Sequence, residues 1–209
     1  MSNSAMKRSK DDDGINLYTT PPWATQSFLE KEELTGGVWE PACGMGHIAK
    51  VVEEFGYNVQ STDLFDHGYG QSGIDFLEYF DPDIETVITN PPYDSNNIQF
   101  DFLKHALAQT NVKKVCFFLP AQFLGTDERA IWLEHSPYFA RYYTFADRVK
   151  CLTNGDEKQS SNNTGTSFAW FVFDKDHDGS PAQIHFLYKP DELKTKNAVA
   201  KREGWLRQV

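Results

Sequence analysis

The sequence predicts an α/β domain in which helices cover both faces of a mostly parallel β-sheet. Short runs rich in β-branched and aromatic residues alternate with segments of helical periodicity, as such a sheet requires. The first unit, residues 38–49, reads as a strand, a glycine turn and the start of a helix. The continuous apolar run 115–119 is typical of a strand buried on both faces. Runs at 166–173 and 182–188 predict an antiparallel C-terminal hairpin around 174–181.

The composition is that of a globular protein. Of 209 residues, 40% are hydrophobic and 14% are aromatic, which excludes a wholly disordered chain. No apolar run reaches the roughly 18 residues that a membrane helix needs, and the N-terminus lacks a hydrophobic signal core. We therefore expect a cytoplasmic protein that does not bind membranes. We also expect a disordered arm over 1–14, a single domain over 15–190 and a basic tail over 191–209.

The cysteines and the charge limit the kinds of site that the chain could carry. Cys43, Cys116 and Cys151 lack metal-ligand spacing, which predicts reduced thiols and no metal site. The net charge of −10 argues against strong binding of nucleic acid. The charge is uneven, because residues 30–101 hold 15 acidic and two basic residues whereas residues 102–209 hold 15 basic and 12 acidic ones. A polyanion would therefore meet the C-terminal half or the tails, weakly and in a salt-sensitive way.

Local patterns place the other elements along the chain. A helix is predicted from about residue 21 to 34. Thr20 suits the N-cap, Pro21 suits the first helical position, and the two glycines at 36–37 would end the helix. The polar stretch 153–165 is long for a loop in a compact domain and is a candidate for substrate contacts. Further helices are expected at 48–55, 100–110 and 127–133, and further strands at 58–62, 86–89 and 141–145.

The glycine turn after the first strand has the features of a nucleotide-binding turn. Gly44 and Gly46 let the backbone approach a ligand closely, in the strand–turn–helix order of a Rossmann-like site. Ala49 stands where the dinucleotide pattern would have its third glycine, and Glu40 precedes Gly44 by four residues. A carboxylate there would repel a phosphate and attract an ammonium group. The pattern therefore favours S-adenosylmethionine (SAM) over NAD.

Two aspartates further along suit the rest of such a ligand. Asp63 ends the strand 58–62, where a carboxylate can accept hydrogen bonds from both ribose hydroxyls. The alternative for Asp63 is an N-cap or a loop aspartate. Asp75 follows the glycine-rich loop 68–73, and its alternative role is to cap a helix.

The strand at 86–89 runs into Asn90, Pro91, Pro92 and Tyr93. The two prolines fix φ and donate no backbone hydrogen, so the loop is stiff and its carbonyls are free acceptors. A planar amine could donate one hydrogen to the Asn90 side-chain oxygen and the other to the Pro91 carbonyl while its ring stacks on Tyr93. The alternative is a proline-rich turn that closes a buried strand.

In this order the segments resemble the SAM-dependent amino-methyltransferases, most closely the DNA adenine-N6 type, over roughly residues 16–173. The resemblance implies a Rossmann-like class I methyltransferase fold with a seven-stranded sheet. It also implies that Asp75 receives the adenine amine of SAM, that Phe76 packs on the adenine ring, and that Tyr18 and Thr20 close over the methionine end, where the alternative is a simple helix cap. The residues implied to bind SAM are Tyr18, Thr20, Glu40, Pro41, Ala42, Gly44, Gly46, Asp63, Leu64, Asp75, Phe76 and Asn90.

The catalytic residues implied are Asn90, Pro91, Pro92 and Tyr93. The exocyclic amine of adenine is a poor nucleophile because its lone pair is delocalised, and hydrogen bonds to Asn90 and Pro91 would oppose that delocalisation. In duplex DNA the target base would be flipped out of the stack, and stacking on Tyr93 would offset part of the cost. Two alternatives stay open: the acceptor is an RNA base or a protein glutamine amide, or the chain is a non-catalytic SAM-binding subunit.

The sequence departs from the family in one respect. It shows no counterpart of the usual target-recognition domain. We therefore expect short or relaxed specificity, or specificity supplied by another subunit or a homodimer, as in a small enzyme of a phage or mobile element. Phe145 and Arg148 are candidates to complete the base pocket.

Overall fold

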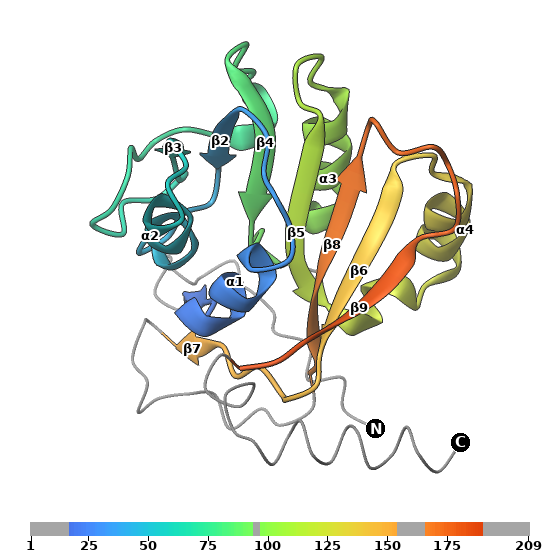
Figure 1. The fold of residues 1–209 in the computed structure, drawn as a ribbon. Helices are drawn as coiled ribbons and strands as arrows, with labels where there is room; N and C mark the ends of the chain where they lie inside the picture. The colour runs from blue at the N-terminus through green and yellow to red at the C-terminus, as the bar shows by residue number, and fades with distance from the viewer. Residues whose placement is uncertain (1–16, 94–96, 154–165, 190–209) are drawn as a thin grey trace.

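The computed structural model of the chain describes residues 17–93, 97–153 and 166–189. Within these residues, seven strands form one sheet in the order β3-β2-β4-β5-β8-β6-β9, and β1 pairs separately with β7 (Figure 1). The strands are β1 (Tyr18–Thr19), β2 (Gly37–Glu40), β3 (Val59–Ser61), β4 (Ile84–Thr89), β5 (Lys114–Pro120), β6 (Phe139–Phe145), β7 (Leu152–Thr153), β8 (Phe168–Asp174) and β9 (Gln183–Leu187). The helices are α1 (Pro22–Leu29), α2 (His47–Glu54), α3 (Ile98–Ala108) and α4 (Asp127–His135), with the 3-10 turns η1 (Phe76–Glu78) and η2 (Ala121–Leu124).

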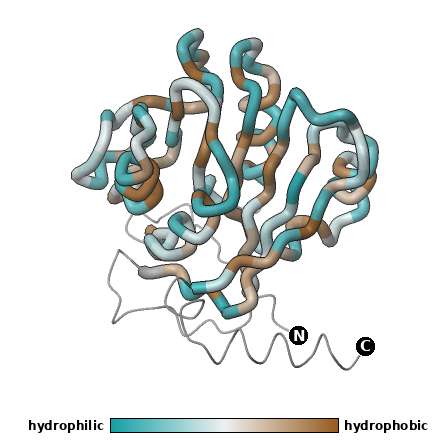
Figure 2. The backbone as a smooth tube through the Cα atoms, viewed as in Figure 1, coloured by the Kyte–Doolittle hydropathy of each residue, from teal (hydrophilic) through white to brown (hydrophobic). Residues whose placement is uncertain are grey.

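Helices cover both faces of the large sheet. The hydrophobic residues of α1 and α2 pack on one face, and those of α3 and α4 pack on the other (Figure 1). β5 supplies both layers, because Cys116 and Phe118 face α1 and α2 while Val115, Phe117 and Leu119 face α3 and α4. Figure 2 shows hydrophobic residues along the central strands. Most strand pairs are parallel, so the predicted α/β fold with a seven-stranded, mostly parallel sheet is confirmed.

The antiparallel part of the sheet differs in detail from the prediction. β8 is antiparallel to both β5 and β6, which confirms an antiparallel strand near the C-terminus. β9, however, runs parallel to β6 at the edge of the sheet. β8 and β9 therefore do not form the hairpin expected around 174–181. Both edges of β8 are occupied by β5 and β6, so β9 pairs with the outer edge of β6 instead.

The first helix is shorter than predicted. α1 ends at Leu29, and residues 30–36, which we call the strap, run on without helical structure to β2 (Figure 1). At the other end, Pro21 occupies the N-cap position and Pro22 is the first helical residue. The predicted N-cap at Thr20 is therefore wrong by one residue. Pro21 offers no side-chain cap, and its carbonyl accepts a hydrogen bond from the Ala24 N–H at 2.9 Å.

Contacts with residues far along the chain explain why the strap leaves the helix. The backbone N–H of Thr35 donates to the Thr86 hydroxyl oxygen at 3.0 Å, and that hydroxyl donates back to the Thr35 carbonyl at 2.8 Å. The N–H of Leu34 donates to the Tyr57 hydroxyl oxygen at 3.2 Å. These bonds use backbone groups that a longer helix would pair internally. Tertiary hydrogen bonds therefore override the helical pattern.

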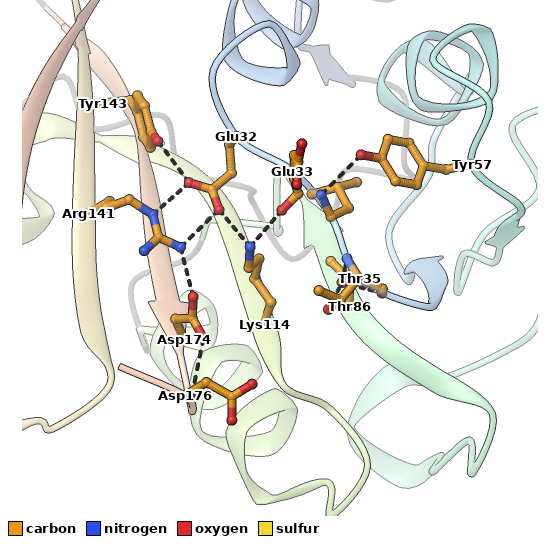
Figure 3. Close-up of polar contacts among 11 residues, drawn as sticks. Glu32, Glu33, Thr35, Tyr57, Thr86, Lys114, Arg141, Tyr143, Asp174 and Asp176 are labelled. Carbon is orange, nitrogen blue, oxygen red and sulfur yellow. Dashed lines mark hydrogen bonds and ion pairs between the residues drawn. The ribbon is translucent and has the colours of Figure 1, made fainter. Parts of the chain in front are cut away.

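A buried polar cluster holds the middle of the strap (Figure 3). Glu32 accepts hydrogen bonds from Arg141 Nε at 2.6 Å, Lys114 Nζ at 2.7 Å and the Tyr143 hydroxyl at 2.7 Å. Arg141 also pairs with Asp174 at 2.8 Å. We call these five residues the Glu32 cluster. Its two cations and two carboxylates come from four separate segments, so it joins the strap to β5, β6 and β8.

The other predicted helices and strands are confirmed to within a few residues, because each carries its own local pattern. The predicted arm over 1–14, the tail over 191–209 and most of the polar stretch 153–165 lie outside the described residues. In the ranges that the structure describes, no helix is long and apolar enough to cross a membrane.

Candidate functional site

A cavity of about 180 Å³, which we call the chamber, opens where β2 and β4 end. A smaller cavity of about 40 Å³ adjoins it and shares Leu17, Tyr18, Ala42 and Asn90 as lining residues. The carboxyl ends of neighbouring parallel strands form the usual ligand crevice of an open α/β sheet. The predicted site residues that line the chamber are Tyr18, Pro41, Ala42, Asp63, Leu64, Asp75, Phe76, Asn90, Pro91, Pro92 and Tyr93.

The glycine turn and the start of α2 border the smaller cavity. Thr20, Glu40 and Gly44 line the smaller cavity, whereas Gly46 lies in the turn and lines neither. Both glycines have left-handed backbones, with φ of +51° at Gly44 and +76° at Gly46. A Cβ on Gly46 would also collide with the Tyr69 ring. Glycine is therefore required at residue 46 by the turn and its packing.

Glu40 is the most buried carboxyl group near the turn. Its side chain is 2% exposed, and Oε2 accepts a hydrogen bond from the Ala49 N–H at 2.8 Å. Burial raises the pKa of Glu40 well above its usual value, and the negative charges of Asp63 and Glu53 raise it further. A positively charged group in the smaller cavity would favour ionisation of Glu40. The site is therefore suited to a cation.

Asp63 joins the end of β3 to the glycine turn. Its Oδ2 accepts from the Gly44 N–H at 2.8 Å, and its Oδ1 accepts from the Phe65 N–H at 3.0 Å. Each carboxylate oxygen retains a lone pair, and Asp63 lines the chamber. The loop role and the ligand role that the sequence left open are therefore compatible in one side chain.

Asp75 is likewise both a cap and a lining residue. Its Oδ1 accepts from the Leu77 N–H at 3.0 Å and so caps the 3-10 turn η1. Phe76 contributes to the chamber wall but is only 1% exposed. Its ring packs against Trp39 and Phe102 with centroid distances of 4.9 Å in each case. The core thus fixes the place at which Phe76 meets the chamber.

The loop after β4 brings Asn90 to the border of both cavities. Asn90 Nδ2 donates to the Tyr18 backbone carbonyl at 3.1 Å, and Asn90 Oδ1 accepts from the Tyr93 hydroxyl at 2.5 Å. The Tyr93 hydroxyl is also 2.7 Å from the Phe118 carbonyl oxygen. Because an amide oxygen has two lone pairs, Oδ1 can accept one further hydrogen bond.

The small sheet of β1 and β7 was missed by the sequence analysis. β1 covers the smaller cavity and is held there by β7 and by Asn90. Each of these strands has only two residues, which is too short to show an alternation of polar and apolar side chains, so no local pattern predicts them. In the smaller cavity, the buried Thr20 hydroxyl and His47 Nδ1 make no hydrogen bond to any described residue. Burial, followed by the charge of Lys50, lowers the pKa of His47.

The candidates proposed to complete the base pocket are not at the chamber. Phe145 packs edge-on against Trp23, with ring centroids 5.4 Å apart, and neither Phe145 nor Arg148 is among the described lining residues. The apolar wall of the chamber was not predicted from the sequence. Apolar side chains that add to the chamber wall are Leu17, Phe65, Ile74, Leu77, Ile98 and Phe102. Apolar residues of this kind carry no signal that separates them from core positions.

Comparisons with known proteins identify the fold. No protein-family profile and no curated protein matches the sequence. A candidate class I S-adenosylmethionine-dependent methyltransferase from Listeria monocytogenes is 15% identical, with a TM-score of 0.53 over 90% of this chain and 71% of that one. A candidate RNA methyltransferase from Pyrococcus horikoshii is 16% identical, with a TM-score of 0.55 over 79% of this chain and 90% of that one.

A third similar structure is the modification subunit of a candidate type I restriction enzyme from Vibrio vulnificus. It is 15% identical, with a TM-score of 0.52 over 85% of this chain. The match spans 48% of that subunit, so this chain corresponds to about half of it. At such identities the likeness concerns the fold alone. The chain has the fold of the class I methyltransferases, with the chamber at the ligand-binding edge of the sheet.

Proposed function

We propose that the chain binds SAM across the chamber and the smaller cavity and transfers its methyl group to the exocyclic N6 amine of adenine in DNA. One observation carries this proposal. The loop of Asn90 and Pro91 borders the chamber at the end of β4, and Asp63 and Asp75 line the same chamber. Acceptors for an amine and carboxylates for a nucleoside are thereby brought into one cavity in a class I methyltransferase fold.

The residues present fit SAM. The free lone pairs of Asp63 suit the ribose hydroxyls, and the second oxygen of Asp75 suits the adenine amine. The buried Glu40 suits the ammonium group of the methionine end. The unpaired Thr20 hydroxyl and His47 Nδ1 supply polar partners for the rest of that end. When bound, SAM supplies a methyl group already activated by a positive sulfur.

The chain's own residues would orient the acceptor amine. Asn90 Oδ1 and the Pro91 carbonyl accept its two hydrogens, so the nitrogen lone pair is directed at the methyl group rather than into the ring. Holding the reactants in line is worth several orders of magnitude in rate. The Tyr93 ring, which lines the chamber, provides a face for the base, and a stacked base is worth roughly 1 to 3 kcal/mol. The amine loses its proton after the transfer.

The likeness to a modification subunit supports a DNA acceptor, and a partner subunit or a second copy of the chain would then supply sequence recognition. The likeness to a candidate RNA methyltransferase and the net charge of −10 favour the second candidate, an RNA base or a protein glutamine amide. All these acceptors present a planar N–H group. The chemistry at Asn90 is therefore common to them, and the acceptor is decided by experiment.

The test is transfer of radiolabelled methyl from SAM to unmethylated duplex DNA, with RNA and protein extract run in parallel. We expect label in N6-methyladenosine of DNA. Label only in RNA or protein would select the second candidate, and no label with SAM bound would indicate a non-catalytic SAM-binding subunit.

The variant Asn90→Ala tests the site itself. We expect kcat to fall at least about 100-fold, as when one charge-stabilising group is removed from other active sites, while SAM affinity measured by calorimetry changes far less. The matched control is Asn111→Ala, because Asn111 precedes β5 at the opposite end of the sheet and bonds only to the Pro82 carbonyl among the bonds described. Equal losses of SAM binding and transfer in folded Asn90→Ala would contradict this role.

A further inference from the structure

The hydroxyl of Tyr93 is placed for a task separate from that of its ring. It lies 2.5 Å from Asn90 Oδ1 and 2.7 Å from the Phe118 carbonyl oxygen, both of which are hydrogen-bond acceptors. The ring packs against the hydrophobic clusters on both faces of the sheet. The side chain is therefore fixed along its whole length, with its hydroxyl inside the protein, and it contributes to the lining of the chamber.

This hydroxyl remains a donor under any assay condition near neutrality. Burial raises the pKa of the Tyr93 phenol well above its usual value, and the nearby Cys151 contributes in the same direction. The Phe118 and Asn90 oxygens share the single hydroxyl proton between them. Both partners can only accept, so the hydroxyl proton lies toward these two oxygens.

The two ends of the Asn90 amide have opposite partners. The Tyr18 carbonyl can only accept, so it selects Nδ2, and this turns Oδ1 toward the Tyr93 hydroxyl, which donates to it. Rotating the amide by half a turn would place two acceptors against each other at Tyr18. The pair of contacts therefore determines which end of the amide is oxygen, an assignment that rests on hydrogen-bond partners.

We propose that Tyr93 is a positioning residue whose hydroxyl fixes the Asn90 amide with Oδ1 as the acceptor for the substrate N–H. This inference rests on the proposed function of the chamber. Without the hydroxyl, the Tyr18 carbonyl would be the one hydrogen-bond partner of the amide left among the described residues. A turned amide would present Nδ2 to the substrate amine, donor against donor, and the contact would be repulsive. The hydroxyl thus acts on the reaction through Asn90, and the ring acts on the base directly.

The experiment compares Tyr93→Phe, which keeps the ring, with Tyr93→Ala, which removes both parts. In Tyr93→Phe we expect kcat to fall roughly 10- to 100-fold, the size of effect that small misplacements of reacting groups produce. KM and SAM affinity should stay within about threefold of wild type, because binding contacts are kept. In an Asn90→Ala background the same change should have no further effect on kcat, because the two residues act as a unit.

Tyr143→Phe is the matched control. It also removes one buried hydroxyl, which donates to Glu32 at 2.7 Å, but it lies outside the chamber. It should lower stability and leave kcat unchanged. If Tyr93→Phe keeps wild-type kcat, or if both variants lower kcat equally, the positioning role is overturned.

A readout without turnover separates this inference from the proposed function. In isotope-labelled protein, the side-chain amide signals of Asn90 are identified by their loss in Asn90→Ala. We expect them to shift in Tyr93→Phe and to stay unchanged in Tyr143→Phe. If wild-type protein methylates no acceptor, the proposed function fails, and these signals still decide the positioning role. Unchanged Asn90 signals in Tyr93→Phe would overturn it.

Discussion

Replacing Glu32 by glutamine removes the central anion of the Glu32 cluster. The carboxylate is 4% exposed and accepts from Lys114, Arg141 and Tyr143 at 2.6 to 2.8 Å (Figure 3). In wild type the two cations are balanced by Glu32 and Asp174. In Glu32→Gln, one buried positive charge loses its counter-charge, and the new amide hydrogens face other donors. The strap would then lose its main attachment to β5 and β6.

The size of the loss follows from the burial of the group. Removing one member of a buried ion pair costs about 3 to 5 kcal/mol, a large part of the roughly 5 to 15 kcal/mol that stabilises a typical domain. For a protein of this size, about 1 kcal/mol shifts the melting temperature by roughly 2 to 4 °C. We therefore expect the melting temperature of Glu32→Gln to fall by roughly 6 to 20 °C at neutral pH.

The loss should depend on pH. Burial by itself would raise the pKa of Glu32, but hydrogen bonds from Arg141 and Lys114 outweigh it, so the pKa lies below its usual value of 4.5. A depressed folded pKa means that the carboxylate stabilises the fold fully above pH 4.5 and stops doing so as the pH falls through the lowered value. The difference between wild type and Glu32→Gln should be constant near neutrality and should shrink in acid.

Urea and thermal unfolding of both proteins at several pH values measure this difference. The control is Glu85→Gln. Glu85 lies 2.9 Å from Lys113, whose side chain is half exposed, so the melting temperature of this variant should equal that of wild type. A loss in Glu32→Gln below about 1 kcal/mol, typical of a surface pair, would refute the reasoning.

Two further predictions concern the turn beside the chamber. Glu40→Gln keeps an acceptor for the Ala49 N–H but removes a carboxyl group whose pKa burial raises, so wild type is destabilised as the pH rises above 4.5. The melting temperature of the variant should exceed that of wild type at pH 8 and equal it at low pH. Calorimetry should show weaker SAM binding by the variant. Equal melting temperatures at pH 8 would count against a protonated Glu40. Gly46→Ala strains a φ of +76° and collides with Tyr69, whereas Gly56→Ala at +90° meets open space. In urea, Gly56→Ala should lose about 1 to 2 kcal/mol and Gly46→Ala more; equal losses would contradict the Tyr69 contact.

Local patterns predicted most of the framework correctly. The apolar run of β5 and the period of α2 each follow from a few neighbouring residues, and the glycine turn requires a left-handed backbone at Gly44 and Gly46. The end of a parallel strand also places Asn90 at the ligand edge of the sheet, because such ends gather there. These features depend on residues that are close together in the sequence, so they can be predicted from it.

Other features depend on partners far along the chain. The polar residues of the strap fit a helix until Thr86 and the Glu32 cluster offer bonds from separate strands. The edge position of β9 depends on which strand edges remain free after β8 is placed. The apolar chamber wall and the pairing of β1 with β7 have no distinguishing local signal.

The sequence by itself determined the type of fold, the glycine turn and the loop of Asn90 at the end of β4, because backbone preferences and hydrophobic periodicity act over a few residues. Only the tertiary structure decided how that loop is held. The Asn90 amide is oriented by Tyr18 and Tyr93, and Tyr93 by the Phe118 carbonyl. Those partners come from three different strands or loops. Their meeting depends on packing of the whole sheet, which no local pattern records.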